Sequence, residues 1–214
     1  MSPRPPIVLI TMRVDDVRER RDALDQAWYS VLEKMGTSPC LVPNAGVGHA
    51  ARLIDELKPA LILLTGGNDL VATGQEETSA PERDEVEATL IDHAANKAIP
   101  LFGVCRGMQM LVSHYGGSLR RGTGHAGTQH GLISESSCST WSRASVNSFH
   151  DWVIHEEDLP AVMEPLARAD DGTIEAVRHR THPQMGVLWH PERMPRAAED
   201  VDLIRSFMLD NQRG

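Results

Sequence analysis

Residues 99–115, IPLFGVCRGMQMLVSHY, contain the features that decide the fold. The run from Ile99 to Val104 is almost wholly apolar, which is typical of a strand buried on both faces of a parallel sheet. Residues at helical spacing follow it, namely Met108, Leu111, Val112 and Tyr115. The stretch therefore predicts a buried strand that leads directly into a helix.

The turn between this strand and helix is Gly103-Val104-Cys105-Arg106-Gly107. Glycines two residues before and after Cys105 allow a sharp strand-to-helix turn, because neither has a Cβ atom that would clash. A nucleophilic residue is commonly presented on such a turn. Free N–H groups at the helix N-terminus favour a thiolate, so we expect a lowered pKa for Cys105. The alternative is that Cys105 is simply a small buried apolar residue.

Strand-like and helix-like segments alternate through the first half of the chain. The expected strands are residues 6–10, 40–43 and 60–64, and the expected helices are residues 19–35, 49–58 and 81–97. This order predicts a flavodoxin-like, doubly wound α/β fold, in which helices cover both faces of a parallel sheet.

The character of the sequence changes after Gly116, where glycines punctuate a polar stretch that reaches about residue 154. We expect hairpins and loops there, forming a small antiparallel extension over the active-site edge of the sheet. Residues 174–177 and 185–189 predict further strands, and residues 197–209 predict the last helix. Because no linker interrupts the pattern, residues 1–214 are expected to form a single domain.

Net charge, cysteine content and the lack of targeting segments exclude several classes of function. The formal charge of −9 argues against a broad nucleic-acid or membrane surface. The three cysteines, Cys40, Cys105 and Cys138, are too scattered for a disulfide framework. No signal peptide and no membrane-spanning apolar run is apparent, so we expect a cytoplasmic protein.

A base for the cysteine could come from His190-Pro191-Glu192, which directly follows a predicted strand. In an extended segment residues i and i+2 project to the same side, so Glu192 can reach the imidazole of His190. A cysteine, a histidine and a glutamate would form a nucleophilic triad. Without the cysteine turn, the same tripeptide would more commonly be a capped loop.

Acyl transfer also needs hydrogen-bond donors for the developing oxyanion. Gly66-Gly67 follows another predicted strand and can bring backbone N–H groups close to a ligand. The second donor would be the N–H of Arg106, the residue after the nucleophile. An ordinary strand-to-helix turn is an equally good interpretation of Gly66-Gly67 taken alone.

These motifs together resemble the class I glutamine amidotransferase domains, through residues 103–109, 189–192 and 66–69. They are more similar still to the stand-alone γ-glutamyl hydrolases of the peptidase C26 family. Further marks of that branch are residues 83–87, 124–130, 146–150 and 171–176. The resemblance covers nearly the whole chain.

The resemblance implies that Cys105, His190 and Glu192 attack a γ-glutamyl amide and form a thioester that water resolves. It implies that the N–H groups of Gly67 and Arg106 hold the oxyanion. The residues implied to bind the small-molecule substrate are Gln109, Asn147, Ser148, Phe149 and His150, the last three through their backbone. No cofactor and no metal is implied.

Within that branch, residues 10–13, 19–28 and 147–150 resemble the enzymes that hydrolyse a γ-glutamyl-CDP-amidate. Such an enzyme would release glutamate and leave a cytidine diphosphoramidate. We hypothesise that Arg13, at the ligand edge of the sheet, helps to neutralise the diphosphate. The alternative is an ordinary surface or salt-bridged arginine.

His125 and His130 are separated by five positions, which does not suit one helix face, and no neighbouring cysteine or carboxylate set completes a metal site. We expect them to line the cleft entrance. Arg83, Asp84 and Glu87 begin a helix, where ion pairs and capping are the expected roles.

Two alternatives to a free-standing hydrolase remain open. One is a glutaminase subunit that delivers ammonia to a separate synthetase, although the 214 residues leave no room for an attached synthetase. The other is a non-catalytic binding protein on the same fold. The sequence also leaves open whether the chain forms a homodimer.

Overall fold

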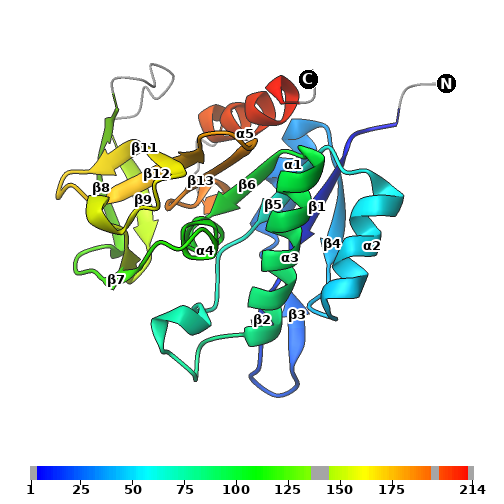
Figure 1. Cartoon of the computed structure of the whole chain (residues 1–214), viewed down its shortest axis with the longest axis horizontal. Helices are drawn as coiled ribbons and strands as arrows, with labels where there is room; N and C mark the ends of the chain where they lie inside the picture. The colour runs from blue at the N-terminus through cyan, green and yellow to red at the C-terminus, as the bar shows by residue number, and fades with distance from the viewer. Residues whose placement is uncertain (1–3, 136–144, 194–197, 212–214) are drawn as a thin grey trace.

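The computed structural model describes residues 4–135, 145–193 and 198–211, so Cys138 and Ala197 lie outside the described residues. A nine-stranded sheet organises the molecule (Figure 1). Its strands are β1 (Ile7–Thr11), β4 (Ser38–Val42), β5 (Leu61–Leu64), β6 (Leu101–Val104), β8 (Ala126–Ser134), β9 (Ser145–Phe149), β11 (Met163–Ala169), β12 (Ile174–His179) and β13 (Gln184–Val187). Two short ribbons stand apart, β2 (Arg13–Asp15) with β3 (Arg21–Ala23) and β7 (Arg120–Arg121) with β10 (Trp152–Val153).

The sheet has a parallel part and an antiparallel part. Its strand order is β4-β1-β5-β6-β13-β12-β11-β8-β9. The pairings from β4 to β13 are parallel, and those from β13 to β9 are antiparallel. The predicted antiparallel extension is therefore continuous with the parallel strands. Since parallel strands end at a common edge, β1, β5, β6 and β13 deliver their following residues to one place.

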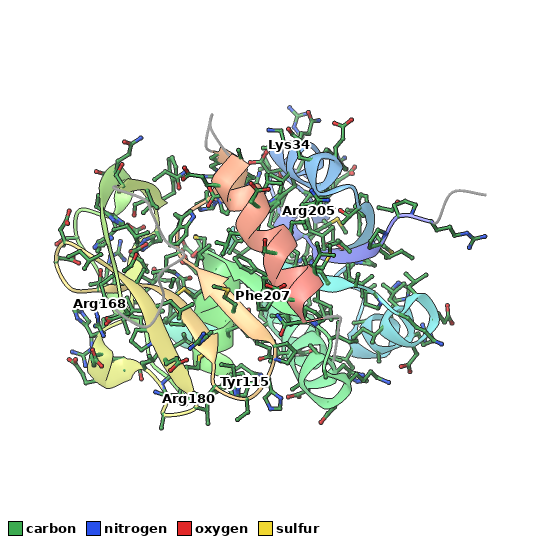
Figure 2. The ribbon with its side chains drawn as sticks, turned by 90° about the horizontal axis from the view of Figure 1, so that it is seen from above. Lys34, Tyr115, Arg168, Arg180, Arg205 and Phe207 are labelled. Carbon is green, nitrogen blue, oxygen red and sulfur yellow. The ribbon has the colours of Figure 1, made fainter. Side chains whose placement is uncertain are left out.

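Helices cover both faces of the sheet, as the predicted doubly wound α/β fold requires. The helices are α1 (Ala27–Met35), α2 (Val47–Leu57), α3 (Pro81–Lys97), α4 (Arg106–His114) and α5 (Ala198–Asp210), with short 3-10 turns η1 (Val71–Thr73), η2 (Glu156–Asp158) and η3 (Pro191–Arg193). One apolar core contains α1 and α5, and the other contains α2, α3 and α4. Figure 2 shows α5, with Phe207 labelled, lying across the sheet. The ring of Phe207 packs edge-on against that of Phe102 in β6, with ring centroids 5.7 Å apart. Among the described helices, none has the length and apolar character to cross a bilayer.

The expected helix over residues 19–35 is wrong in its first part, because α1 begins only at Ala27. Residues 21–23 instead pair with residues 13–15 as an antiparallel ribbon. The side chain of Asn68 bonds both the N–H and the C=O of Val14, at 2.8 and 2.9 Å, and so holds this ribbon beside the sheet edge. The Asp25 carboxylate then accepts the N–H of Ala27 at 3.0 Å, at the start of the helix.

Candidate active site

Cys105 stands on the sharp turn that the glycine spacing predicted. Its backbone has φ 52° and ψ −109°, a conformation that a residue with a side chain rarely adopts. A Cβ on Gly103 would lie 2.6 Å from the backbone of Gly107, and a Cβ on Gly107 would lie 2.4 Å from the Leu64 carbonyl oxygen. Only glycine fits at either position, which confirms the geometric part of the prediction.

His190 connects Cys105 with Glu192. The imidazole and Cys105 both lie beside Gly66 and line one cavity, and the imidazole Nδ1 lies 2.7 Å from Glu192 Oε1. Cys105 and His190 are buried, and so is the side chain of Glu192. The chain therefore places a thiol, an imidazole and a carboxylate close to one another, in residues that follow β6 and β13.

The electrostatics of this group favour an ion pair between thiolate and imidazolium. Burial works against a charged sulfur, but the nearby charge of His190 outweighs burial and lowers the pKa of Cys105. Burial likewise opposes a charged imidazole, yet Cys105 and Glu192 raise the pKa of His190 to about 9. Both pKa shifts thus favour the charged thiolate–imidazolium form over the neutral pair.

Asn147 fixes the backbone that carries His190. Its amide nitrogen donates to the His190 carbonyl oxygen at 2.9 Å, and its amide oxygen accepts the His190 N–H at 2.8 Å. With both ends of the amide engaged, Asn147 positions the histidine and does not present its side chain to a substrate. The family resemblance implied substrate binding for Asn147, whereas the hydrogen bonds described for its amide are with the His190 backbone.

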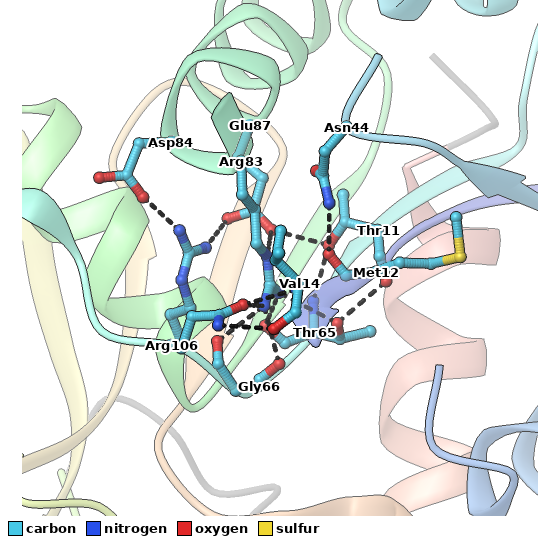
Figure 3. A network of polar contacts seen from close by, with 12 residues as sticks. Thr11, Met12, Val14, Asn44, Thr65, Gly66, Arg83, Asp84, Glu87 and Arg106 are labelled. Carbon is cyan, nitrogen blue, oxygen red and sulfur yellow. Dashed lines mark hydrogen bonds and ion pairs between the residues drawn. The ribbon is translucent and has the colours of Figure 1, made fainter. Parts of the chain in front are cut away.

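Gly66 and Gly67 lie beside the Cys105 turn. A Cβ on Gly66 would lie 2.8 Å from His190 Cε1, and Gly67 has φ 87°, so both positions require glycine. Arg83 Nη1 donates to the carbonyl oxygens of Gly66 and Gly67, at 3.1 and 2.7 Å (Figure 3). Because a peptide group is planar, fixing the Gly66 carbonyl also fixes the direction of the Gly67 N–H.

Arg83 belongs to a buried ionic network that also holds Arg106. Arg83 Nε and Thr11 Oγ1 donate to Glu87 Oε1 at 2.9 and 2.8 Å. The Arg106 guanidinium pairs with Glu87 and Asp84, as Figure 3 shows. The ion pairs expected for Arg83, Asp84 and Glu87 are thereby confirmed. One network constrains both predicted oxyanion donors.

A cavity of about 410 Å³ opens at Cys105. Its lining includes Gly67, Asn68, Asp69, Thr78, Cys105, Arg106, Gln109, Phe149, His150, Asp151, Trp152, His190 and Arg193. Most of the predicted site residues are in this set. Four of them, Arg13, Asn147, Ser148 and Glu192, lie outside the lining that the described part of the chain provides.

Two arginines stand near the mouth of this cavity. Arg13 is exposed, packs against Gly67 and lines a smaller neighbouring cavity. Arg193 lines both cavities, and its guanidinium carbon lies 5.0 Å from the centroid of the Phe149 ring. Sequence reasoning missed Arg193, although its place directly after Glu192 was the signal that could have found it.

His125 and His130 do not stand alone. Both lie with His150 and Glu175 in one cluster, whose potential ligand atoms are all within 4.8 Å of one another. The prediction that no carboxylate set joins the two histidines was wrong, because Glu175 comes from β12, far along the sequence. Sheet pairing, which the spacing of the histidines could not reveal, brings them together.

The chain is similar in sequence or in fold to several known proteins. Over 132 residues it is 33% identical to γ-glutamyl-CDP-amidate hydrolase of Campylobacter jejuni, a match that covers 62% of each chain. Over 181 residues it is 23% identical to the glutamine-hydrolysing GMP synthase subunit of Thermococcus kodakarensis, covering 84% of this chain and 88% of that one. The crystal structure of a candidate GMP synthase subunit from Thermoplasma acidophilum superposes with a TM-score of 0.74 at 17% identity, covering 99% of this chain and 98% of that chain.

The family comparison agrees with the fold. Residues 20–211 match the family described as glutamine amidotransferase class-I. This range contains the cysteine turn, the two glycines of the neighbouring strand end and the histidine with its glutamate. The chain therefore belongs to the class I glutamine amidotransferase family.

Proposed function

We propose that this protein hydrolyses a γ-glutamyl amide, with Cys105 as nucleophile, His190 as proton carrier and Glu192 as the group that orients His190. The observation that supports this most directly is His190 itself. It lies 2.7 Å from Glu192 on one side, and on the other it shares with Cys105 the lining of a single cavity beside Gly66. That is the arrangement an activated cysteine nucleophile needs.

In the first half-reaction the Cys105 thiolate attacks the amide carbonyl carbon. The carbonyl oxygen becomes an oxyanion, which the N–H groups of Gly67 and Arg106 stabilise. The imidazolium of His190 then gives its proton to the leaving nitrogen as the C–N bond breaks. The products are a free amine or amidate and a glutamyl thioester on Cys105.

In the second half-reaction His190, now neutral, accepts a proton from water. The resulting hydroxide attacks the thioester carbonyl, and the C–S bond breaks to release glutamate and the thiolate. Gln109 and the backbone around Phe149 and His150 hold the glutamyl group during both steps. Gln109 is well placed for this, because its Nε2 is fixed by the Trp152 carbonyl oxygen at 3.1 Å while its side chain lines the cavity.

The leaving group that we favour is a cytidine diphosphoramidate. The relative that matches at 33% identity is a γ-glutamyl-CDP-amidate hydrolase. Arg193 lines both cavities, and Arg13 packs against Gly67 and lines the smaller one, so both arginines are candidates to bind a diphosphate. Arg13 has no ion-pair partner among the described residues, which leaves it free to bind an anion.

Glutamate release from three substrates tests the proposal: glutamine, γ-glutamyl-GABA and γ-glutamyl-CDP-amidate. We expect release from at least one of them, with loss by about 10³-fold or more in Cys105→Ala. Mass spectrometry of quenched wild type should show a glutamyl adduct on Cys105. A protein that hydrolyses none of them and resists alkylation at Cys105 would be a binding protein instead.

The contribution of Arg13 is tested separately. Arg13→Ala should weaken hydrolysis of the nucleotide substrate while leaving a neutral γ-glutamyl amide almost unaffected, because only the former carries a diphosphate. Equal losses on both substrates would show that Arg13 does not recognise the nucleotide.

A second candidate is supply of ammonia to a separate synthetase. It is favoured by the GMP synthase subunit of Thermococcus kodakarensis, which this chain matches over 84% of its length. The distinguishing result is ammonia release from glutamine that appears only when a synthetase is added. Release of glutamate from a γ-glutamyl nucleotide by the protein alone favours the first candidate.

A further inference from the structure

Three histidines and a glutamate converge beside the active-site cavity, and the proposed hydrolysis does not use their side chains as a group. They are His125, His130, His150 and Glu175. The first precedes β8, the second lies within β8, the third follows β9 and the glutamate belongs to β12. Segments far apart in sequence thus direct their polar atoms at a single point.

The outward nitrogen of each imidazole has a partner. His125 Nε2 lies 2.9 Å from Asp171 Oδ2. His130 and His150 each place Nδ1 against a backbone carbonyl oxygen, at 3.1 and 3.0 Å. Since these partners accept hydrogen bonds, the outward nitrogens carry the protons, and a neutral ring then turns a lone pair toward its neighbours.

The inward atoms are different. Nδ1 of His125, Nε2 of His130 and of His150, and both carboxylate oxygens of Glu175 are buried and make no hydrogen bond in the described part of the chain. The three nitrogens lie 3.8, 3.4 and 3.4 Å from Glu175 Oε1. A charge-assisted N–H···O⁻ bond would be about 2.7–2.9 Å long, so the atoms are spaced too widely for good hydrogen bonds.

We propose that this cluster binds a divalent transition-metal ion of the zinc type, through the inward nitrogens of His125, His130 and His150 and a carboxylate oxygen of Glu175. With metal–ligand bonds of about 2.0–2.2 Å, neighbouring ligands of a tetrahedral site lie about 3.3–3.6 Å apart. The two separations of 3.4 Å have this length. Imidazole and carboxylate are also ligands that zinc accepts readily.

The surroundings of the cluster suit a metal as well. Each ligating histidine of a zinc site normally donates its other N–H to a carboxylate or a carbonyl group, and all three do so here. Three neutral imidazoles and one carboxylate would leave a charge of +1 on the site. The carboxylate of Asp171, bonded to His125, offsets that charge.

The role of the ion would be structural. Four protein ligands complete a tetrahedral site and leave no position for water or substrate. The ion would join the β8–β9 hairpin to β12, and Phe149, immediately before His150, lines the active-site cavity. Binding would therefore hold one wall of the cavity in place without entering the reaction.

The alternative occupant is a proton. Glu175 raises the pKa of His130, so an imidazolium could face the carboxylate in place of a metal.

Measurement of bound metal separates a metal ion from a proton as the occupant of the cluster. The full-length protein is stripped with a chelator, supplied with a slight excess of Zn²⁺, passed through a desalting column and analysed for zinc by mass spectrometry. We expect about one zinc per chain, and Co²⁺ in its place should give the visible absorption bands of a four-coordinate ion.

Variants assign the ion to the cluster. Glu175→Gln and His130→Ala should weaken binding by about 10-fold or more, whereas His93→Ala, which changes a histidine on α3, should bind like wild type. Cys105→Ala should retain its zinc, because the thiol is not a ligand. The same variant should lose glutamate release, so the metal proposal and the proposed hydrolysis can fail independently.

Three results would overturn the proposal. The first is less than about 0.1 zinc per chain in wild type after loading. The second is equal binding by wild type and Glu175→Gln, and the third is zinc that disappears in Cys105→Ala while it persists in His130→Ala. If either cluster variant does not fold, the Co²⁺ spectrum of wild type decides alone, since bands of a six-coordinate ion or of thiolate ligation contradict the proposed ligands.

Discussion

Glu87 and Glu175 are both fully buried glutamates near the cavity, yet their surroundings differ completely. Both oxygens of Glu87 accept hydrogen bonds, from Thr11 and Arg83 on one side and from Arg106 on the other. Neither oxygen of Glu175 has a hydrogen bond in the described part of the chain, and three imidazoles face it at 3.4 Å or more.

The difference indicates two ways in which a protein can compensate the energetic cost of burying a carboxylate. Burial of an ion is costly unless charges and hydrogen bonds compensate it. Around Glu87, two guanidinium groups supply that compensation from within the chain. Around Glu175, the imidazoles supply lone pairs or shared protons, and a cation from solution would complete the site.

The largest effect is expected from Glu87→Gln. The variant leaves the guanidinium groups of Arg83 and Arg106 buried without their shared anion, which should lower the free energy of unfolding by about 3–5 kcal/mol. Urea denaturation, followed by fluorescence at pH 7, measures the change.

The matched control is Glu85→Gln, which removes the same charge from an exposed position of α3. It should change the free energy of unfolding by no more than about 0.5 kcal/mol. Similar losses in the two variants would mean that the buried ionic network contributes nothing specific.

A smaller effect is expected at Glu175, and only when metal is present. Zinc at about 100 times its dissociation constant should raise the free energy of unfolding of wild type by about 2.7 kcal/mol. Glu175→Gln should not respond to zinc, because it lacks the carboxylate ligand. Paired denaturation curves with zinc and with chelator measure the increment.

The response of Glu87→Gln to zinc tests whether the clusters around Glu87 and Glu175 are independent of each other. Its ionic network shares no residue with the histidine cluster, so this variant should keep the full zinc increment although its basal stability is low. Loss of the increment in Glu87→Gln would show that the two buried clusters are coupled.

The next effect concerns catalysis. Arg83→Lys keeps a positive charge but cannot hold Glu87 and the two glycine carbonyls at once, because an ammonium lacks the planar fork of a guanidinium. The Gly67 N–H should then be less well oriented toward the oxyanion. We expect kcat to fall about tenfold while KM is retained.

Arg83 is a positioning residue, so its test needs a second readout. Alkylation of Cys105 by iodoacetamide does not use the oxyanion donors, and its rate should therefore match wild type in Arg83→Lys. Parallel losses of kcat and of alkylation would indicate general damage to the site.

Local sequence patterns predicted the parts of the fold and site that depend on neighbouring residues. The turn at Cys105 follows from Gly103 and Gly107, which pack against backbone that no side chain could approach. Glu192 does lie against His190, but the extended segment from which this pairing was predicted is wrong, because residues 191–193 form the 3-10 turn η3. The buried strands were likewise visible as short apolar runs.

The features that the sequence did not predict depend on contacts between residues far apart in the chain. Apolar spacing predicted a helix from Glu19, but residues 21–23 found a partner in residues 13–15. Glu175 joins the histidines only because β8, β11 and β12 are neighbours in the sheet. The side chain of Asn147 turns to the backbone of His190, an interaction across 43 residues that no periodicity encodes.

The smallest effect concerns the pH dependence of hydrolysis. It tests the proposed catalytic pair, Cys105 and His190, rather than the buried clusters around Glu87 and Glu175. Because Cys105 and Glu192 raise the pKa of His190 to about 9, the imidazolium proposed to protonate the leaving nitrogen persists through neutral pH and is lost as the pH rises through that value. The value of kcat/KM for a γ-glutamyl amide should therefore fall to about half of its plateau near pH 9. Glu192→Gln removes one of the charges that raise this pKa, so its alkaline limb should move to lower pH. An alkaline limb near pH 6.5, the ordinary pKa of histidine, in wild type would contradict the thiolate–imidazolium pair.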